Sequence, residues 1–169
     1  NIEFARVIPN GLADLISVQK NLKYLNVQLD KSYFITLRTD IITLLANNLP
    51  DTLIKLETEE APLPWLIVAK LKNLQEIILS YRYQSALEDF KEFQYISFSN
   101  LQILRFEDEC PRNELLIKFL ENNGKNLKEF YVDHRNNLLN LTIAKFCPNL
   151  RKLYTVFEKA ETLKIILNS

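Results

Sequence analysis

Apolar and polar positions alternate in a short phrase that recurs along the chain, each time after a stretch with helical spacing. The phrase is Asn-Leu-x-x-apolar-x-apolar, and its clear copies begin at Asn21, Asn73, Asn100, Asn126 and Asn149, with a weaker copy at Thr52. Side chains alternate between the two faces of a strand, so each phrase predicts one short strand. The expected strands are Tyr24–Val27, Lys55–Thr58, Glu76–Leu79, Ile103–Phe106, Glu129–Val132 and Lys152–Thr155.

The segments between these strands have the apolar spacing of amphipathic helices. Leu37, Ile41, Leu44 and Leu45 stand at i, i+4, i+7 and i+8, and so do Leu139, Ile143, Phe146 and Cys147. Further helices are expected at Leu12–Val18, Trp65–Leu71, Leu87–Phe93 and Leu115–Leu120. Pro64 is expected to begin one of them, Asn113 to cap another, and Asn123-Gly124 to end that one. After Leu150 there is room for one more strand at Leu163–Leu167, which fits either a final unpaired or hairpin-like edge or an array truncated in its middle, and we favour truncation.

The spacing of the copies identifies the architecture. The lead leucines stand at 22, 53, 74, 101, 127 and 150, at intervals of 31, 21, 27, 26 and 23 residues. Leucine-rich repeats are roughly 20–29 residues long. The sequence therefore predicts an α/β leucine-rich-repeat solenoid, an open arc with parallel strands on the concave face and helices on the convex face. Leu74, Leu101, Leu127 and Leu150 are expected to be buried and stacked along it.

Composition narrows the remaining choices. With 169 residues, 47% apolar, and no linker of low complexity, residues 1–169 are expected to form one domain. Lys and Arg number 21, as do Asp and Glu, which argues against a nucleic-acid or anionic-membrane surface. The chain lacks Met and starts on Asn1 within an amphipathic pattern, so we expect a fragment of a longer protein. Two cysteines without a secretory leader favour the cytoplasm or nucleus.

Candidate chemistry is sparse. His134 is the single histidine, and Cys110 and Cys147 are distant from it in sequence, so no nucleophile–base pair or tetrahedral metal site follows from spacing. Cys147 is expected in the core, Cys110 half exposed in a loop, and His134 solvated at a strand end. No phosphate-binding glycine loop is present. We therefore expect neither an enzyme nor a bound cofactor or metal.

One stretch resembles a known subtype of repeat. Residues 138–153 contain the run Ala-x-x-Cys-Pro-Asn-Leu-x-x-Leu, which is similar to the cysteine-containing leucine-rich repeats of F-box proteins, in the style of the long fungal arrays. The usual Cys about eight residues after the lead leucine is absent, and only Cys110, one place later, comes near. The resemblance implies repeats that hold a protein for ubiquitination. A Skp-type adaptor of a cullin-based ubiquitin ligase would then dock on an F-box segment outside this chain.

The outward strand positions form the candidate binding surface. Its central column is Asn26, Glu57, Ile78, Arg105, Tyr131 and Tyr154, flanked by Tyr24, Lys55, Glu76, Ile103, Glu129 and Lys152 on one side and by Gln28, Glu59, Ser80, Glu107, Asp133 and Val156 on the other. Tyr and Arg dominate binding hot spots, although aromatic residues also suit any sheet face. Two acidic runs, Glu57–Glu60 and Glu107–Glu109, are expected at one edge, either as a rim for a basic partner or as solvated loops.

The sequence thus favours a non-catalytic module that holds a protein partner on the concave face. Within that class, the substrate-binding region of an F-box subunit is the leading hypothesis, and a scaffold or inhibitor without a ligase link is the alternative. A receptor ectodomain is disfavoured, because the cysteine-rich caps of that class are missing from this chain.

Overall fold

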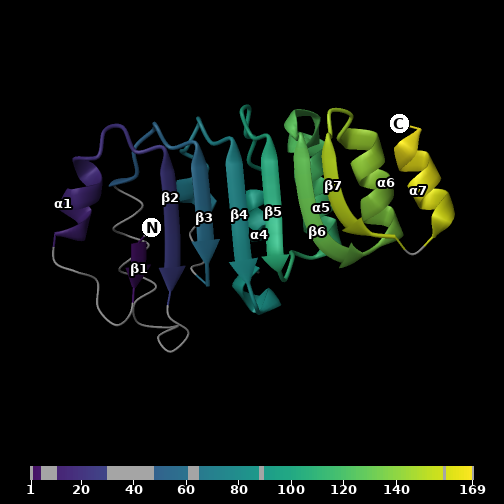
Figure 1. The fold of residues 1–169 in the computed structure, drawn as a ribbon, viewed down its shortest axis with the longest axis horizontal. Helices are drawn as coiled ribbons and strands as arrows, with labels where there is room; N and C mark the ends of the chain where they lie inside the picture. The colour runs from purple at the N-terminus through teal and green to yellow at the C-terminus, as the bar shows by residue number, and fades with distance from the viewer. Residues whose placement is uncertain are drawn as a thin grey trace.

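The computed structural model describes residues 2–4, 11–29, 48–60, 65–87, 90–157 and 159–168. These residues form one parallel seven-stranded sheet whose strands follow chain order from β1 to β7 (Figure 1). The strands are β1 (Ile2–Phe4), β2 (Tyr24–Leu29), β3 (Lys55–Glu59), β4 (Glu76–Tyr81), β5 (Ile103–Asp108), β6 (Glu129–Arg135) and β7 (Lys152–Val156). All six predicted strands are confirmed. The sequence did not predict β1, which has only three residues.

The helices alternate with the strands, and several of them lie behind the sheet in Figure 1. They are α1 (Leu12–Ser17), α3 (Trp65–Val68), η1 (Gln84–Leu87), α4 (Phe90–Phe93), α5 (Asn113–Asn123), η2 (Gly124–Asn126), α6 (Asn137–Phe146) and α7 (Ala160–Leu167). The predicted open leucine-rich-repeat arc is confirmed. The face of the sheet opposite the helices that lie behind it, which we call the open face, carries the outward-pointing strand residues.

The lead leucines form the core beneath the strand starts, as predicted for the interior of the array. Leu74, Leu101 and Leu127 are almost completely buried. Leu150 is only partly buried, so the prediction of full burial was wrong at this position. The physical reason is its place in the array, since β7 is the last strand of the described sheet and has a neighbouring strand on one side alone.

The recurring asparagine of the phrase has a structural role. In four copies its side-chain amide nitrogen donates to a backbone carbonyl of the preceding unit: Asn73 to Asp51 at 2.7 Å, Asn100 to Lys72 at 3.0 Å, Asn126 to Phe98 at 3.1 Å and Asn149 to Lys125 at 2.8 Å. Thr52, in the weaker copy, donates to the carbonyls of Lys20 and Leu22 at 3.2 and 2.8 Å. Each copy is thereby fastened to the turn before it.

The strands from β3 to β7 also each begin on a shared acceptor. The carbonyl of Lys23 receives the N–H groups of both Ile54 and Lys55, at 2.9 and 3.0 Å. The carbonyls of Ile54, Gln75, Gln102 and Lys128 each receive two N–H groups from the next unit in the same way. Because the same residue of every unit supplies this carbonyl, the register of successive strands is fixed at their first residues.

Aromatic side chains fill the space between the middle strands and the short helices. Phe93 and Phe119 stack with ring centroids 5.1 Å apart, and Phe90 contacts both of them and Phe106 at 4.9–5.8 Å. Large rings compensate for helix α4, which has only four residues. They support β5 from behind.

Several expectations about element ends were wrong. Leu163–Leu167 lies in α7 and is not an edge strand. Its apolar residues at 163, 166 and 167 also fit helical spacing, and α7 packs on α6. Asn113 is the first residue of α5 and not its cap, which is Arg112 without a side-chain cap bond. The expected helix around Leu37–Leu45 and the start at Pro64 lie outside the described residues.

Gly124 ends α5, as predicted, but not through a left-handed conformation. Its φ of −57° is available to any residue. Glycine is required here by close packing, because a Cβ atom would stand 2.6 Å from the carbonyl oxygen of Phe146 and 2.8 Å from Sγ of Cys147. This contact brings the end of α5 against the end of α6.

Candidate functional site

The six residues of the predicted central column lie in one row across the open face. Pairing runs Asn26–Glu57–Ile78–Arg105–Tyr131–Tyr154, one residue from each of six neighbouring strands. Parallel strands lie about 4.8 Å apart, so the row is roughly 24 Å long. Its members differ in accessibility, since Tyr154 is 56% exposed whereas Ile78 is only 6% exposed.

The predicted flanking columns are confirmed in part. Tyr24, Lys55, Glu76, Ile103, Glu129 and Lys152 also pair in one row. In the other column, Gln28, Glu59, Ser80 and Glu107 are in register. Its last pair was wrong, because an irregularity between Tyr131 and Arg135 makes Val156 pair with Arg135 and not with Asp133.

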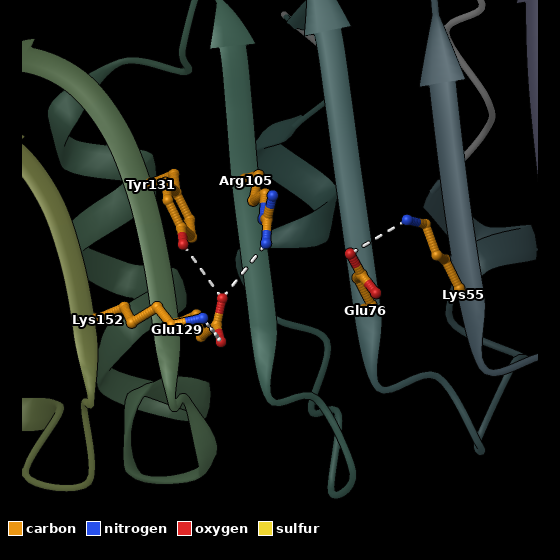
Figure 2. A network of polar contacts seen from close by, with 6 residues as sticks. All are labelled: Lys55, Glu76, Arg105, Glu129, Tyr131 and Lys152. Atoms are coloured by element: carbon orange, nitrogen blue, oxygen red, sulfur yellow. Dashed lines mark hydrogen bonds and ion pairs between the residues drawn. The ribbon is translucent and has the colours of Figure 1, made fainter.

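Glu129 organises the C-terminal half of the open face (Figure 2). Its carboxylate accepts a hydrogen bond from Nζ of Lys152 at 2.8 Å, contacts the Arg105 guanidinium at 3.3 Å and accepts from the Tyr131 hydroxyl at 3.2 Å. The hydrogen bond from Lys152 is the main cause that lowers the pKa of Glu129, helped by Tyr131 and by the charges of Lys152 and Arg105. We call Arg105, Glu129, Tyr131 and Lys152 the Glu129 network.

Arg105 is held on a second side by the ring of Tyr131. The guanidinium carbon lies 4.3 Å from the ring centroid, which is a cation–π distance. Its Nε atom is buried and has no hydrogen-bond partner among the residues that the structure describes. Because the carboxylate of Glu129 and the ring of Tyr131 both hold Arg105, its side chain is ordered before any partner arrives.

A smaller ionic group lies toward the N-terminal side of the same face. Nζ of Lys55 contacts Glu76 at 3.2 Å across strands and Glu57 at 3.6 Å along β3 (Figure 2 draws the contact with Glu76). Ile78 and Ile103 stand between this group and the Glu129 network on β4 and β5. Across the open face, ion-paired charged side chains therefore alternate with apolar side chains.

The two acidic runs end at the same edge of the sheet, as expected from their register, on β3 and β5 with β4 between them. Glu107, Asp108 and Glu109 are exposed there. Glu60 does not belong to an exposed rim, because it is 3% exposed and its carboxylate accepts from the backbone N–H of Arg82 at 3.2 Å. The Nε atom of Arg82 lies 3.7 Å from the same oxygen. Glu60 therefore stabilises the end of β3.

Neither cysteine is suited to nucleophilic chemistry. Burial raises the pKa of Cys147 to about 12. Burial, followed by the charges of Glu109 and Asp133, raises the pKa of Cys110 to about 11. The expectation that Cys110 is half exposed was wrong, since 5% of it is accessible. The thiolate is the reactive form, and at neutral pH both residues are thiols.

The remaining candidate chemistry gives little. His134 is the second-to-last residue of β6, so it lies at a strand end as expected, but it is half-buried and not fully solvated. Among the described residues, no three His, Cys, Asp or Glu side chains gather closely enough to hold a metal ion. In the same part of the chain, no helix has the length and apolar character needed to cross a bilayer.

The charged residues of the open face were predicted from the sequence, but the ion pairs between them were not. The signal was present, because Lys55 faces Glu76 and Glu129 faces Lys152 in the predicted register, and opposite charges on adjacent strands attract. Hollows of about 500, 340 and 190 Å³ lie at the sheet's two edges and near α6 and β7, away from the centre of the open face. The open face therefore offers a broad surface and not a small-molecule cavity.

Comparison with known proteins supports the fold and goes no further. No model of a known protein family matches the chain, and no curated protein matches it. Among solved structures, the chain is similar to the tropomodulin C-terminal domain of Caenorhabditis elegans, with 13% sequence identity and a TM-score of 0.52. The likeness covers 92% of this chain and 87% of that one. At this identity, the likeness confirms a leucine-rich-repeat-like α/β fold.

Proposed function

We propose that this domain is a non-catalytic protein-recognition module that holds a protein partner on its open face. The observation that carries the proposal is the in-register row from Asn26 to Tyr154, backed along half its length by the Glu129 network. A row of side chains about 24 Å long suits an extended or helical segment of a protein better than a small molecule.

The proposed anchors of this surface are Arg105, Tyr131 and Tyr154, which lie side by side on β5, β6 and β7. Tyrosine supplies a large contact area with few rotatable bonds, and truncating such an anchor often costs about 2 kcal/mol or more of binding free energy. Arg105 is already ordered by Glu129 and the Tyr131 ring. A partner that contacts these side chains therefore loses little conformational entropy in doing so.

The test starts with a partner recovered by cross-linking to the full-length protein, followed by affinity measurement on variants. Replacing Arg105, Tyr131 and Tyr154 together by Ala is expected to weaken binding at least a hundredfold. Tyr83→Ala with Tyr95→Ala is the matched control, because both tyrosines are exposed and neither belongs to the open-face row. Binding that survives the triple change, or that is lost in the control, contradicts the proposal.

A more specific form of this proposal assigns the domain to the substrate-binding repeats of an F-box subunit, located in the cytoplasm or nucleus. Its support is the resemblance of residues 138–153 to the cysteine-containing repeat. In the structure this stretch forms α6, a turn and the start of β7. Co-purification of a Skp-type adaptor with the full-length protein is the expected result. A partner bound without any adaptor instead supports the scaffold or inhibitor alternative.

A further inference from the structure

The charges of this neutral chain are segregated between the two edges of the sheet. The stretches directly before β2 to β7 are residues 18–23, 49–54, 69–75, 94–102, 124–128 and 147–151, all of them described. They carry Lys20, Lys23, Lys70, Lys72, Lys125, Lys128 and Arg151, and Asp51 is the one acid among them. We call this the strand-start edge, which is the upper edge in Figure 1.

The opposite edge, where the strands end, is richer in acids. It carries Glu59, Glu107, Asp108, Glu109 and Asp133, alongside Arg112 and Arg135, whereas the buried Glu60 is paired with Arg82. A net charge of zero therefore hides two edges of opposite sign. The strands between them have five to seven residues, so the edges lie roughly 16–23 Å apart. That separation is about two to three Debye lengths at physiological salt, and each edge acts nearly independently on a small ligand.

The strand-start edge is hollowed at its C-terminal half. A hollow of about 340 Å³ is lined by the cations Lys125, Lys128 and Arg151 and by the amides of Gln102, Asn126 and Asn149, with no acidic residue in its lining. Two of these amides are fixed in place, since Asn126 donates to the carbonyl of Phe98 and Asn149 to that of Lys125. The hydrogen bonds that fasten the units together thus also shape the hollow.

The cations of this hollow are available to a ligand. Nζ of Lys128 donates to Oε1 of Gln102 at 2.7 Å, which positions one ammonium group and leaves two of its protons. Lys125 and Arg151 are exposed, and within the described part of the chain neither makes an ion pair. Three cations on two neighbouring turns therefore face solvent around a polar hollow.

We propose that the strand-start edge, centred on this hollow, binds an acidic polypeptide segment. Carboxylates match the lining, because Arg151 can receive one in a bidentate manner and the lysines can receive others as point charges. The hollow has no aromatic side chain in its lining, so it lacks a platform on which nucleic-acid bases stack. A long polyanion would also be repelled by the acidic strand-end edge, which a short segment does not reach.

The surface lies beyond the proposed function, since it requires no contact with the open-face row. Lys152, a member of the Glu129 network, follows Arg151 directly, so a partner on the open face has a route to this edge. The two proposals nonetheless use different side chains and can fail separately.

The experiment measures fluorescence anisotropy of a labelled decapeptide rich in Glu and Asp, with a Gly-Ser decapeptide as the neutral probe. The double variant Lys125→Glu, Arg151→Glu is expected to weaken binding of the acidic probe by about tenfold or more, since attraction becomes repulsion. The matched control, Lys159→Glu with Lys164→Glu, has the same net charge on exposed residues away from this edge, and it should change binding less than about twofold. Binding by the unaltered protein should weaken as salt is raised.

Several outcomes overturn the proposal. These are no binding of the acidic peptide at low salt, equal loss in the edge and control variants, or equal affinity for the neutral peptide. Tighter binding of a single-stranded oligonucleotide of the same charge, lost in the edge variant, would identify a polyanion surface instead. Tyr131→Ala with Tyr154→Ala should leave peptide binding intact. Loss of peptide binding in this tyrosine variant would show that the peptide binds the open face and would refute a separate edge site.

Discussion

The interior units of the array and its last unit are built from the same phrase, yet they bury it to different degrees. In the units of β5 and β6, Leu101, Leu127 and Phe130 are 0% exposed. In the unit of β7 the equivalent residues Leu150 and Leu153 are only partly buried. The local structure is the same in both places, because the phrase forms a strand in each. The difference shows that full burial of a repeat is supplied by the unit that follows it.

The largest expected effect comes from removing a buried leucine side chain from the interior of the array. Leu127→Ala is expected to lower the free energy of unfolding by about 2–5 kcal/mol, from lost transfer energy and an internal cavity. Leu150→Ala should cost about 1–2 kcal/mol, because its side chain is already partly solvated and leaves a smaller void. Urea unfolding of both variants measures the difference. Equal losses would show that the last unit is as tightly packed as the interior.

The junction between interior and last unit depends on Gly124. Gly124→Ala is expected to cost about 1–3 kcal/mol, because the new Cβ meets the backbone of Phe146, which cannot move without shifting α6. Lys125→Ala is the control, since it also places an alanine in this short turn, one residue later and at an exposed position. A Gly124 variant as stable as the control would mean that α5 and α6 separate readily.

Losing an asparagine hydrogen bond should also cost more stability in the interior than in the last unit, with a smaller difference than for the leucines. Asn126→Ala leaves the Phe98 carbonyl without this donor in a partly buried position and is expected to cost about 1–2 kcal/mol. Asn149→Ala removes an exposed bond, whose carbonyl water can satisfy, and should cost less than about 0.5 kcal/mol. Thermal unfolding of the pair reports the difference. A larger loss at Asn149 would reverse the comparison.

The smallest expected effect is electrostatic and depends on pH. The pKa of Glu129 is lowered from its ordinary value of 4.5, so its carboxylate contributes stability that is fully present above that value. The contribution is lost as pH falls through the lowered pKa. Glu129→Gln should therefore be less stable than the unaltered protein at neutral pH, and the gap should close in acid. Urea midpoints between about pH 7 and pH 3 follow it, and a gap independent of pH would exclude the ionic origin.

The strands were predictable because the phrase repeats both its alternation and its spacing. Tyr24, Lys55, Glu76, Ile103, Glu129 and Lys152 each begin a strand where the phrase places one. The segment Leu163–Leu167 was assigned wrongly because its apolar positions satisfy period 2 and helical spacing equally, and packing on α6 decides between them. The one-turn helices α3 and α4 were predicted at the right places, but the predicted segments were too long.

The open-face row was also predictable, because pairing in chain order converts equivalent positions into neighbours. Two features were not. The irregularity in β6 that displaces Asp133 leaves no mark in the apolar pattern. The burial of Glu60 depends on its φ of 52° and on contacts with Arg82 from the next unit, which a run of acidic letters does not reveal.

The shared carbonyls at the strand starts have a consequence for how this chain tolerates change. Lead leucines are separated by as few as 21 and as many as 31 residues, yet the side-chain rows stay aligned from β2 to Tyr131 and Tyr154. Each strand takes its position from a carbonyl such as that of Gln75 or Gln102 and not from the length of the loop and helix before it. Insertions and deletions on the helical side are therefore confined to their own unit. The open face can keep its geometry, and whatever it recognises, while the back of the molecule diverges.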